Sequence, residues 1–142
     1  MTQSENPFHF EKVGELISTN PLRFTPDTPA MDVAIELLSS HQSGGPVVNE
    51  SGLYLGFISE VDILKAIDRA QDLKVVTAQN IMNKDRHVIH DSTPIQDAIR
   101  LMVEHHILNL SVEDSKGVVT KTFSRHDLLR GHLGVDLGID EE

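Results

Sequence analysis

Gly56-Phe57-Ile58-Ser59-Glu60-Val61-Asp62 reads as a strand that runs directly into a helix. Residues 54–58 are mostly apolar and favour strand structure, and Ser59 is a preferred N-cap for the periodic apolar run that follows. The end of the strand is therefore followed directly by the N-terminus of a helix. The first backbone N–H groups there lack partners, and the helix dipole is positive.

This helix start has two interpretations. Ser59 and Asp62 lie three residues apart on one face of the first turn, where the N–H groups suit a phosphate and the carboxylate can accept both hydroxyls of a ribose. The alternative is that Ser-x-x-Asp only caps the helix, which contributes about 1 kcal/mol. Both interpretations can hold together.

The same motif occurs twice in the chain. The second copy is Lys121-Thr122-Phe123-Ser124-Arg125-His126-Asp127, and Gly117, Ser124 and Asp127 answer Gly52, Ser59 and Asp62 at a separation of 65. Ala98-Ile99 answers Ala34-Ile35 at a separation of 64, which predicts one inserted residue between these blocks. A repeat of this length indicates a duplicated half-domain, with two halves packed about a pseudo-twofold axis.

The repeat divides the chain into four parts. We expect an N-terminal segment (1–12), a first repeat (13–71), a second repeat (72–132) and an acidic tail (133–142). In the first repeat the pattern predicts helices over residues 8–17, 31–41 and 59–71, and strands over 22–25, 47–49 and 53–58. The second repeat follows the same order, with an extended segment at 87–89 and a helix bearing apolar residues from 95 to 103.

Composition limits the class of protein. With 142 residues and 39% hydrophobic side chains, the chain is long enough to bury a core as one domain or one tightly coupled pair. The net charge of −10 makes duplex nucleic acid a poor partner. Cysteine is absent, no apolar run reaches the length of a membrane span, and the N-terminus lacks the pattern of a secretory signal. We therefore expect a cytoplasmic protein without membrane insertion.

Each repeat resembles a cystathionine-β-synthase (CBS) domain, and the pair resembles a stand-alone Bateman module. The residues that carry the resemblance are 16–21, 24–28, 44–49 and 56–62 in the first repeat, and 81–82, 88–92, 110–114 and 124–127 in the second. The resemblance implies an α/β fold of two tandem β-α-β-β-α repeats that form dimers. It also implies a regulatory module that binds an adenosine-containing ligand between the repeats and acts on a partner protein.

The resemblance assigns roles to particular positions. The serines of the motif, Ser59 and Ser124, would lie near phosphate, and Asp62 and Asp127 would hold the ribose. The base would lie among Thr19, Pro21, Leu22, Pro46 and Val47 in one cleft, and among Arg86, His87, Leu110 and Ser111 in the other.

The second repeat departs from the family pattern. Lys121 stands where a glycine is expected and Ser111 where a proline is expected. The lysine would either block its cleft or reach a phosphate. The Ser59 and Asp62 cleft is therefore the better candidate for a nucleoside, and Arg125 and His126 are candidates for phosphate contacts.

No other chemistry is supported by the sequence. His87 and His90 would lie on opposite faces of a strand, and His105 and His106 diverge on a helix, so we predict no metal site in the protein itself. No catalytic motif is present, and we predict no enzyme activity. The predicted ligands are AMP, ADP, ATP or S-adenosylmethionine, with a divalent ion accompanying a polyphosphate. The alternative is a ligand-free dimerisation or interaction module.

Overall fold

The computed structural model describes residues 10–134, so most of the predicted N-terminal segment and acidic tail lies outside the described residues. The first repeat contains the 3₁₀ turn η2 (Val13–Glu15) and then α1 (Ala30–Ser40), β1 (Gly44–Val48), β2 (Tyr54–Ser59) and α2 (Glu60–Asp68). The second contains α3 (Ala78–Ile81), β3 (Val88–Ile89), α4 (Ile95–His105), β4 (Asn109–Glu113), β5 (Val119–Ser124) and α5 (Arg125–Leu133). This order confirms the predicted α/β fold of two tandem repeats.

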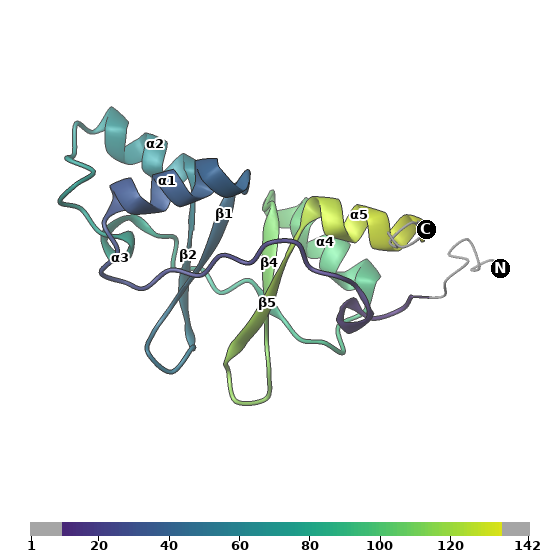
Figure 1. The fold of residues 1–142 in the computed structure, drawn as a ribbon. Helices are drawn as coiled ribbons and strands as arrows, with labels where there is room; N and C mark the ends of the chain where they lie inside the picture. The colour runs from purple at the N-terminus through teal and green to yellow at the C-terminus, as the bar shows by residue number, and fades with distance from the viewer. Residues whose placement is uncertain (1–9, 135–142) are drawn as a thin grey trace.

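The two repeats stand side by side, with a strand hairpin and two longer helices in each (Figure 1). β1 pairs antiparallel with β2, and β4 pairs antiparallel with β5 and parallel with β3. Phe24 takes the place of β3 in the first repeat. Its N–H donates to Pro46 O at 2.9 Å, and it accepts from Val48 N–H at 2.8 Å. α1, α2, α4 and α5 lie at the same end of the molecule, opposite the two hairpin loops.

Equivalent positions of the two repeats are 65 residues apart in their helices as well as in their motifs, so the predicted insertion of one residue is wrong. Pro29 and Pro94 are the N-caps of α1 and α4, and His41 and His106 are their left-handed C-caps. Ala98 therefore corresponds to Val33, since both occupy the buried stripe of their helices. The prediction matched Ala98-Ile99 to Ala34-Ile35 because the two dipeptides are identical. They stand one position apart in their helices, where apolar residues of the same type can occur by chance.

In the described part of the predicted helix over residues 8–17, which begins at residue 10, the helical segment is only the short turn η2. The N–H groups of Val13 and Gly14 donate to Thr93 O and Asp91 O, at 2.9 and 3.0 Å, and not to carbonyls four residues earlier, so they are not part of an α-helix that begins before them. A Cβ on Gly14 would lie 2.9 Å from both Cβ and O of Asp91, so glycine permits this close approach. The first turn of the chain is thus attached to the second repeat.

A matching contact attaches the first turn of the second repeat to the first repeat. Ala78 N–H, at the start of α3, donates to Thr28 O of the first repeat at 2.8 Å. Val13 and Leu16 belong to the core around Phe123, and Ala78 belongs to the core around Val33. Each repeat therefore completes the hydrophobic core of the other.

A contact between equivalent positions marks the relation between the repeats. Leu53 and Val118, which occupy the same place in the two hairpins, form an antiparallel bridge, and Val119 N–H donates to Gly52 O at 2.9 Å. Equivalent residues meet in this way where two similar halves face each other about a pseudo-twofold axis. Within residues 10–134, every helix falls short of the length and apolarity required to span a bilayer.

Gly56→Ala should destabilise the protein by about 1–3 kcal/mol, since added volume in a packed site forces backbone shifts. A Cβ at Gly56 would lie 2.7 Å from Asn83 O and 2.8 Å from Met82 Sδ, against the bridge that Phe57 forms with Asn83. Urea denaturation would measure the loss. Lys121→Ala is the matched control at the equivalent position, and its cost should be below about 1 kcal/mol because Lys121 makes only a partly exposed ion pair with Asp91. Equal midpoints for Gly56→Ala and wild type would contradict the prediction.

Candidate functional site

Both Ser-x-x-Asp motifs begin helices, as the sequence predicted. Ser59 is the N-cap of α2, and its N–H donates to Asp62 Oδ2 at 2.9 Å. Ser124 is the N-cap of α5, and its N–H donates to Asp127 Oδ2 at 2.9 Å. The capping interpretation therefore holds for both motifs, which differ in the other contacts of their carboxylates.

Asp62 keeps one oxygen available. Its Oδ2 accepts from the N–H and hydroxyl of Ser59, at 2.9 and 3.1 Å. Within residues 10–134 no hydrogen bond is made to its other oxygen, Oδ1, and the side chain is half-buried. A half-buried carboxylate oxygen at a helix start is suited to accept hydroxyl groups from a ligand.

A cavity of about 330 Å³ opens beside Asp62. Its walls come from β2, the start of α2, the segment before β3, and the turn between α4 and β4. The lining residues include Ser43, Tyr54, Phe57, Ser59, Asp62, Lys65, Asn83, Asp85, His87, His105, His106 and Asn109. The volume lies at the lower end of the range of ligand pockets, and both repeats contribute to it.

Both carboxylate oxygens of Asp127 accept hydrogen bonds from other residues of the protein. It is 1% exposed, and its oxygens accept from Thr19 Oγ1 at 2.7 Å, Thr19 N–H at 3.1 Å and Arg130 Nη2 at 3.3 Å, in addition to Ser124 N–H. The hydroxyl of Thr19 thus takes a position that a ligand hydroxyl would need. The two motifs are alike in sequence and differ in what their aspartates bind.

A network of side-chain amides lies next to Thr19 and is buried at Asn20. The side chain of Asn20, 4% exposed, donates to Gly44 O at 2.8 Å and to Asn109 Oδ1 at 3.2 Å. Gln42 Nε2 donates to Thr19 O at 2.9 Å, and Asn109 Nδ2 donates to Ser43 Oγ at 2.8 Å. These bonds connect the two repeats at the base of both motifs.

The family model described as CBS domain matches residues 13–69 and 78–134. The chain belongs to the CBS-domain family. Uncharacterized protein MJ1404 of Methanocaldococcus jannaschii is 30% identical over 104 residues, and the match covers 73% of this chain and about a quarter (25%) of that relative.

Two solved structures share the fold of this CBS pair. A crystal structure of CBSX2, a CBS-pair protein from Arabidopsis thaliana, in complex with AMP has 26% identity and a TM-score of 0.75, and the match covers 89% of this chain and 98% of that one. The CBS domain pair of protein MJ0100, in complex with 5'-methylthioadenosine and S-adenosyl-L-methionine, has 24% identity and a TM-score of 0.75 over 84% of this chain and 97% of that one. At that identity, MJ0100 shows the fold alone.

Each motif of the CBS pair is faced by a segment of the other repeat. Thr19 of the first repeat contacts Asp127 of the second, and His87 of the second repeat lines the cavity of Asp62 in the first. The sequence did not specify this crossed pairing. It follows from the exchange of the turns η2 and α3, which carries each first segment across to the opposite repeat.

Several residues predicted to surround the base are buried. Val47 and Leu110 are 0% exposed and belong to the two cores, and Pro46 is buried in β1. Ser111 is 1% exposed and shares a hydrogen bond of 3.0 Å with Thr122. Val47, Leu110 and Ser111 therefore offer almost no exposed surface in this structure, and their contacts to a base stay a prediction. Pro21 and Leu22 lie nearer the surface, and their role stays a prediction.

Arg125 and His126 line a different hollow from the one beside Asp62. Together with Ile99, Met102 and Leu129 they border a cavity of about 660 Å³ between α4 and α5. Lys121 Nζ lies 3.3 Å from Asp91 Oδ1 and 5.8 Å from the centre of the Phe123 ring. The predicted phosphate contacts of Arg125 and His126, and the two alternatives for Lys121, stay predictions.

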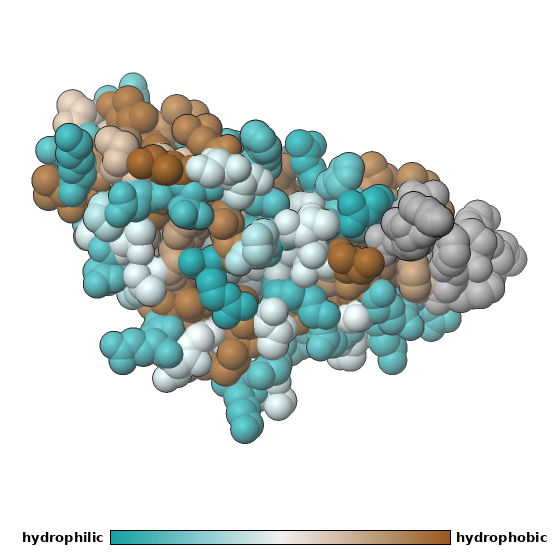
Figure 2. Space-filling model, viewed as in Figure 1, coloured by the Kyte–Doolittle hydropathy of each residue, from teal (hydrophilic) through white to brown (hydrophobic). Residues whose placement is uncertain are grey.

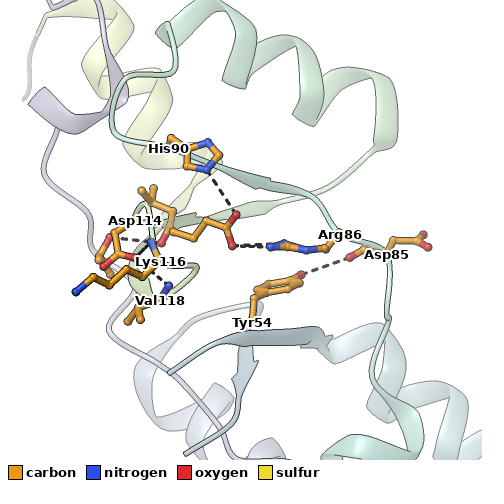
Figure 3. A network of polar contacts seen from close by, with 10 residues as sticks. Tyr54, Asp85, Arg86, His90, Asp114, Lys116 and Val118 are labelled. Carbon is orange, nitrogen blue, oxygen red and sulfur yellow. Dashed lines mark hydrogen bonds and ion pairs between the residues drawn. The ribbon is translucent and has the colours of Figure 1, made fainter. Parts of the chain in front are cut away.

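Arg86 joins the two repeats in a polar network (Figure 3). Its Nη2 lies 2.6 Å from Glu113 Oε1, and its guanidinium carbon lies 5.7 Å from the centre of the Tyr54 ring. The Tyr54 hydroxyl is 3.5 Å from Asp85 O, and His90 Nε2 is 3.5 Å from Glu113 Oε2. Burial raises the pKa of Tyr54 to about 12 against the opposing effect of Arg86, so Tyr54 presents a neutral hydroxyl to the cavity.

The hairpin beside this network is closed by Asp114. The N–H groups of Val118 and Lys116 donate to its carboxylate and hold the pKa of Asp114 below its ordinary value. Asn49 has the same role in the first repeat, where it accepts from the N–H groups of Ser51 and Leu53. The equivalence of these turns extends the repeat to the loops.

Most of the residues that line this cavity were not predicted from the sequence as ligand contacts, among them Tyr54, Lys65, His105 and His106. The equivalence of His106 to His41, 65 residues earlier, predicts the same place after a helix but no ligand contact, because His41 does not line this cavity. His105 and His106 were considered only as metal ligands. Among the described residues, no group of three His, Asp or Glu side chains is arranged to hold a metal ion.

Asp127→Ala should cost about 2–4 kcal/mol of unfolding free energy, because the change removes a buried carboxylate that accepts hydrogen bonds from Thr19, Ser124 and Arg130. Asp62→Ala should cost only about 1 kcal/mol, the value of a helix cap. Urea denaturation of both variants checks the difference. A cost for Asp127→Ala no larger than that for Asp62→Ala would mean that Thr19 does not engage Asp127 in solution.

Proposed function

We propose that this CBS pair is a regulatory module that binds an adenosine-containing ligand in the cleft of Ser59 and Asp62. The observation that carries the proposal is the oxygen Oδ1 of Asp62, which receives no hydrogen bond from residues 10–134 and lies at the start of α2 beside a cavity. Ribose hydroxyls would donate to this carboxylate, and the N-terminus of α2 would lie near the phosphate.

The family supports this class of ligand. CBSX2, 26% identical to this chain, has been crystallised with AMP. The candidate ligands are AMP, ADP, ATP and S-adenosylmethionine. A divalent ion would enter with the phosphates of ADP or ATP and be held largely by their oxygens.

The proposed activity is regulation and not catalysis. A ligand in this cleft would contact α2 of the first repeat and the turn after α4 of the second, so it would favour one arrangement of the repeats over another. The regulated protein is a separate partner, which would respond to that shift. The proposed location is the cytoplasm, in keeping with a sequence that contains no cysteine.

One ligand should bind per chain, because Asp127 is engaged by Thr19. Isothermal calorimetry with AMP, ADP, ATP and S-adenosylmethionine should give a stoichiometry of about one for the ligand that binds. Asp62→Ala should weaken its binding roughly 10–100-fold, the value of losing hydrogen bonds to a charged acceptor.

Asp68→Ala is the matched control for this experiment. Asp68 is an exposed carboxylate at the other end of α2 and is not among the residues that line the cavity. Its removal should leave the affinity unchanged. Equal affinity in wild type and Asp62→Ala would exclude the role assigned to Asp62, and no binding of any of the four ligands would favour the ligand-free interaction module.

Dimer formation is the second part of the proposal. Large apolar side chains are exposed along α1, α2, α4 and α5, and Figure 2 shows hydrophobic surface along the edge where α1, α2 and α5 lie. These side chains are Ile35, Leu38, Val61, Leu64, Ile67, Val103, Leu129 and Leu133. Such faces mark protein interaction sites, and a second copy of the chain, with identical helices, offers a matching apolar surface.

Leu64→Asp should shift the protein from dimer toward monomer. Leu64 is 62% exposed on α2, and a carboxylate buried in a dimer interface without a partner is strongly unfavourable. Sedimentation velocity measures the change. Val75→Asp is the control, since Val75 is 70% exposed outside the helices and should leave the mass unchanged. A monomeric wild type would contradict the dimer.

A further inference from the structure

Three histidines line the cavity that contains Asp62. His87 comes from the segment before β3, and His105 and His106 lie at the end of α4. The ring centroids of His87 and His105 are 4.5 Å apart, with 36° between the ring planes. His106 has a φ of 53° and turns the chain from α4 toward β4. The second repeat thus presents a group of imidazoles to the motif of the first.

The other titratable side chains of the cavity are mostly acidic. They are Glu60, Asp62 and Lys65 of α2, Asp85 of the segment before β3, and Tyr54 of β2. Counted as ionised, these groups give three carboxylates and one ammonium group, and Tyr54 is neutral. The lining therefore has a net charge of −2 while the three imidazoles are neutral. Protonation of all three histidines changes this to an excess of one positive charge.

Proton uptake by this group would depend on the ligand. Imidazole is the side chain that changes its charge between about pH 5 and 8. Two charged rings as close as those of His87 and His105 repel each other unless an anion lies nearby. A phosphate in the cavity would be such an anion. By linkage, if phosphate favours the protonated histidines, protonation must tighten the binding of phosphate by the same factor.

We propose that His87, His105 and His106 form a proton-dependent phosphate subsite in the cleft of Ser59 and Asp62. Nucleotides bind more tightly as the pH falls, whereas a nucleoside without phosphate does not respond. The inference rests on the proposed adenosine site and adds the part of the cavity that receives phosphate. It also means that at higher pH the acidic lining favours uncharged or cationic adenosine compounds over nucleotides.

The test compares AMP with adenosine by calorimetry on the full chain at about pH 8 and about pH 6.5, which brackets the usual range of imidazole titration. The Kd of AMP should fall about fivefold on acidification, at the lower end of common coupling factors. The Kd of adenosine should change by less than about twofold. The difference between the two ligands isolates the phosphate from the rest of the site.

Matched variants identify the groups responsible. His105→Gln removes the stacked ring, and His106→Asn removes the next imidazole with a residue that tolerates the left-handed conformation. His41→Asn is the control, because His41 is the left-handed C-cap of α1 and does not line this cavity. Since phosphate itself takes up a proton near about pH 6, the wild-type response is read against these variants.

The outcomes separate this inference from the proposed function. A pH response of AMP that is lost in His105→Gln and reduced in His106→Asn, but kept in His41→Asn, supports the phosphate subsite. If AMP and adenosine both bind, and the response is absent or the same in every variant, the subsite is excluded while the adenosine site stands. If neither compound binds at either pH, the subsite is excluded, and binding of ADP, ATP or S-adenosylmethionine decides whether the adenosine site stands.

Discussion

The exchange of first turns between the two repeats is the contact on which the molecule depends. Val13 N–H bonds to Thr93 O, and Ala78 N–H bonds to Thr28 O, so each repeat supplies residues to the core of the other. Packing at these points is tight. A Cβ on Gly131 of α5 would lie 2.5 Å from Leu16 Cδ2. Neither repeat has a complete core alone, and the space between them is therefore a fixed part of the fold.

The exchange also explains why two copies of one motif differ. Both serines cap a helix, and both aspartates accept a hydrogen bond from the serine N–H, because this geometry depends only on local sequence. The segments that face the aspartates come from opposite repeats and are different. Thr19 offers a hydroxyl and an N–H to Asp127, while a cavity lined by His87 faces Asp62. Divergence of the facing segment changes one site and leaves the capping intact.

The cleft and the exposed helix faces share the same elements. α2 begins at the cavity and carries Val61, Leu64 and Ile67 on its exposed surface. α4 carries exposed Val103 and ends at the two histidines of the cavity. A shift of the start of α2, or of the end of α4, would therefore also move the apolar side chains that these helices expose. This is the physical route by which a ligand could influence an assembly of CBS pairs.

The sequence by itself determined the longer helices and the hairpins, the duplication and the family. Ser59 and Ser124 cap helices because residue type and spacing are sufficient for a local hydrogen bond, and the apolar stripes place α1 and α4 because burial follows the helical period. The constant offset between the repeats was obscured at Ala34 and Ala98, where neighbouring stripe positions resemble each other.

The sequence ranked the two clefts only from Lys121 and Ser111, and the tertiary structure supplied the physical difference between their aspartates. Whether an aspartate is free depends on contacts made across 108 residues of sequence, such as Thr19 to Asp127, and no local pattern encodes them. The group formed by His87, His105 and His106 has the same origin. Its members are separated in the chain and meet because the end of α4 returns toward the segment before β3, so their proximity is a property of packing and not of spacing.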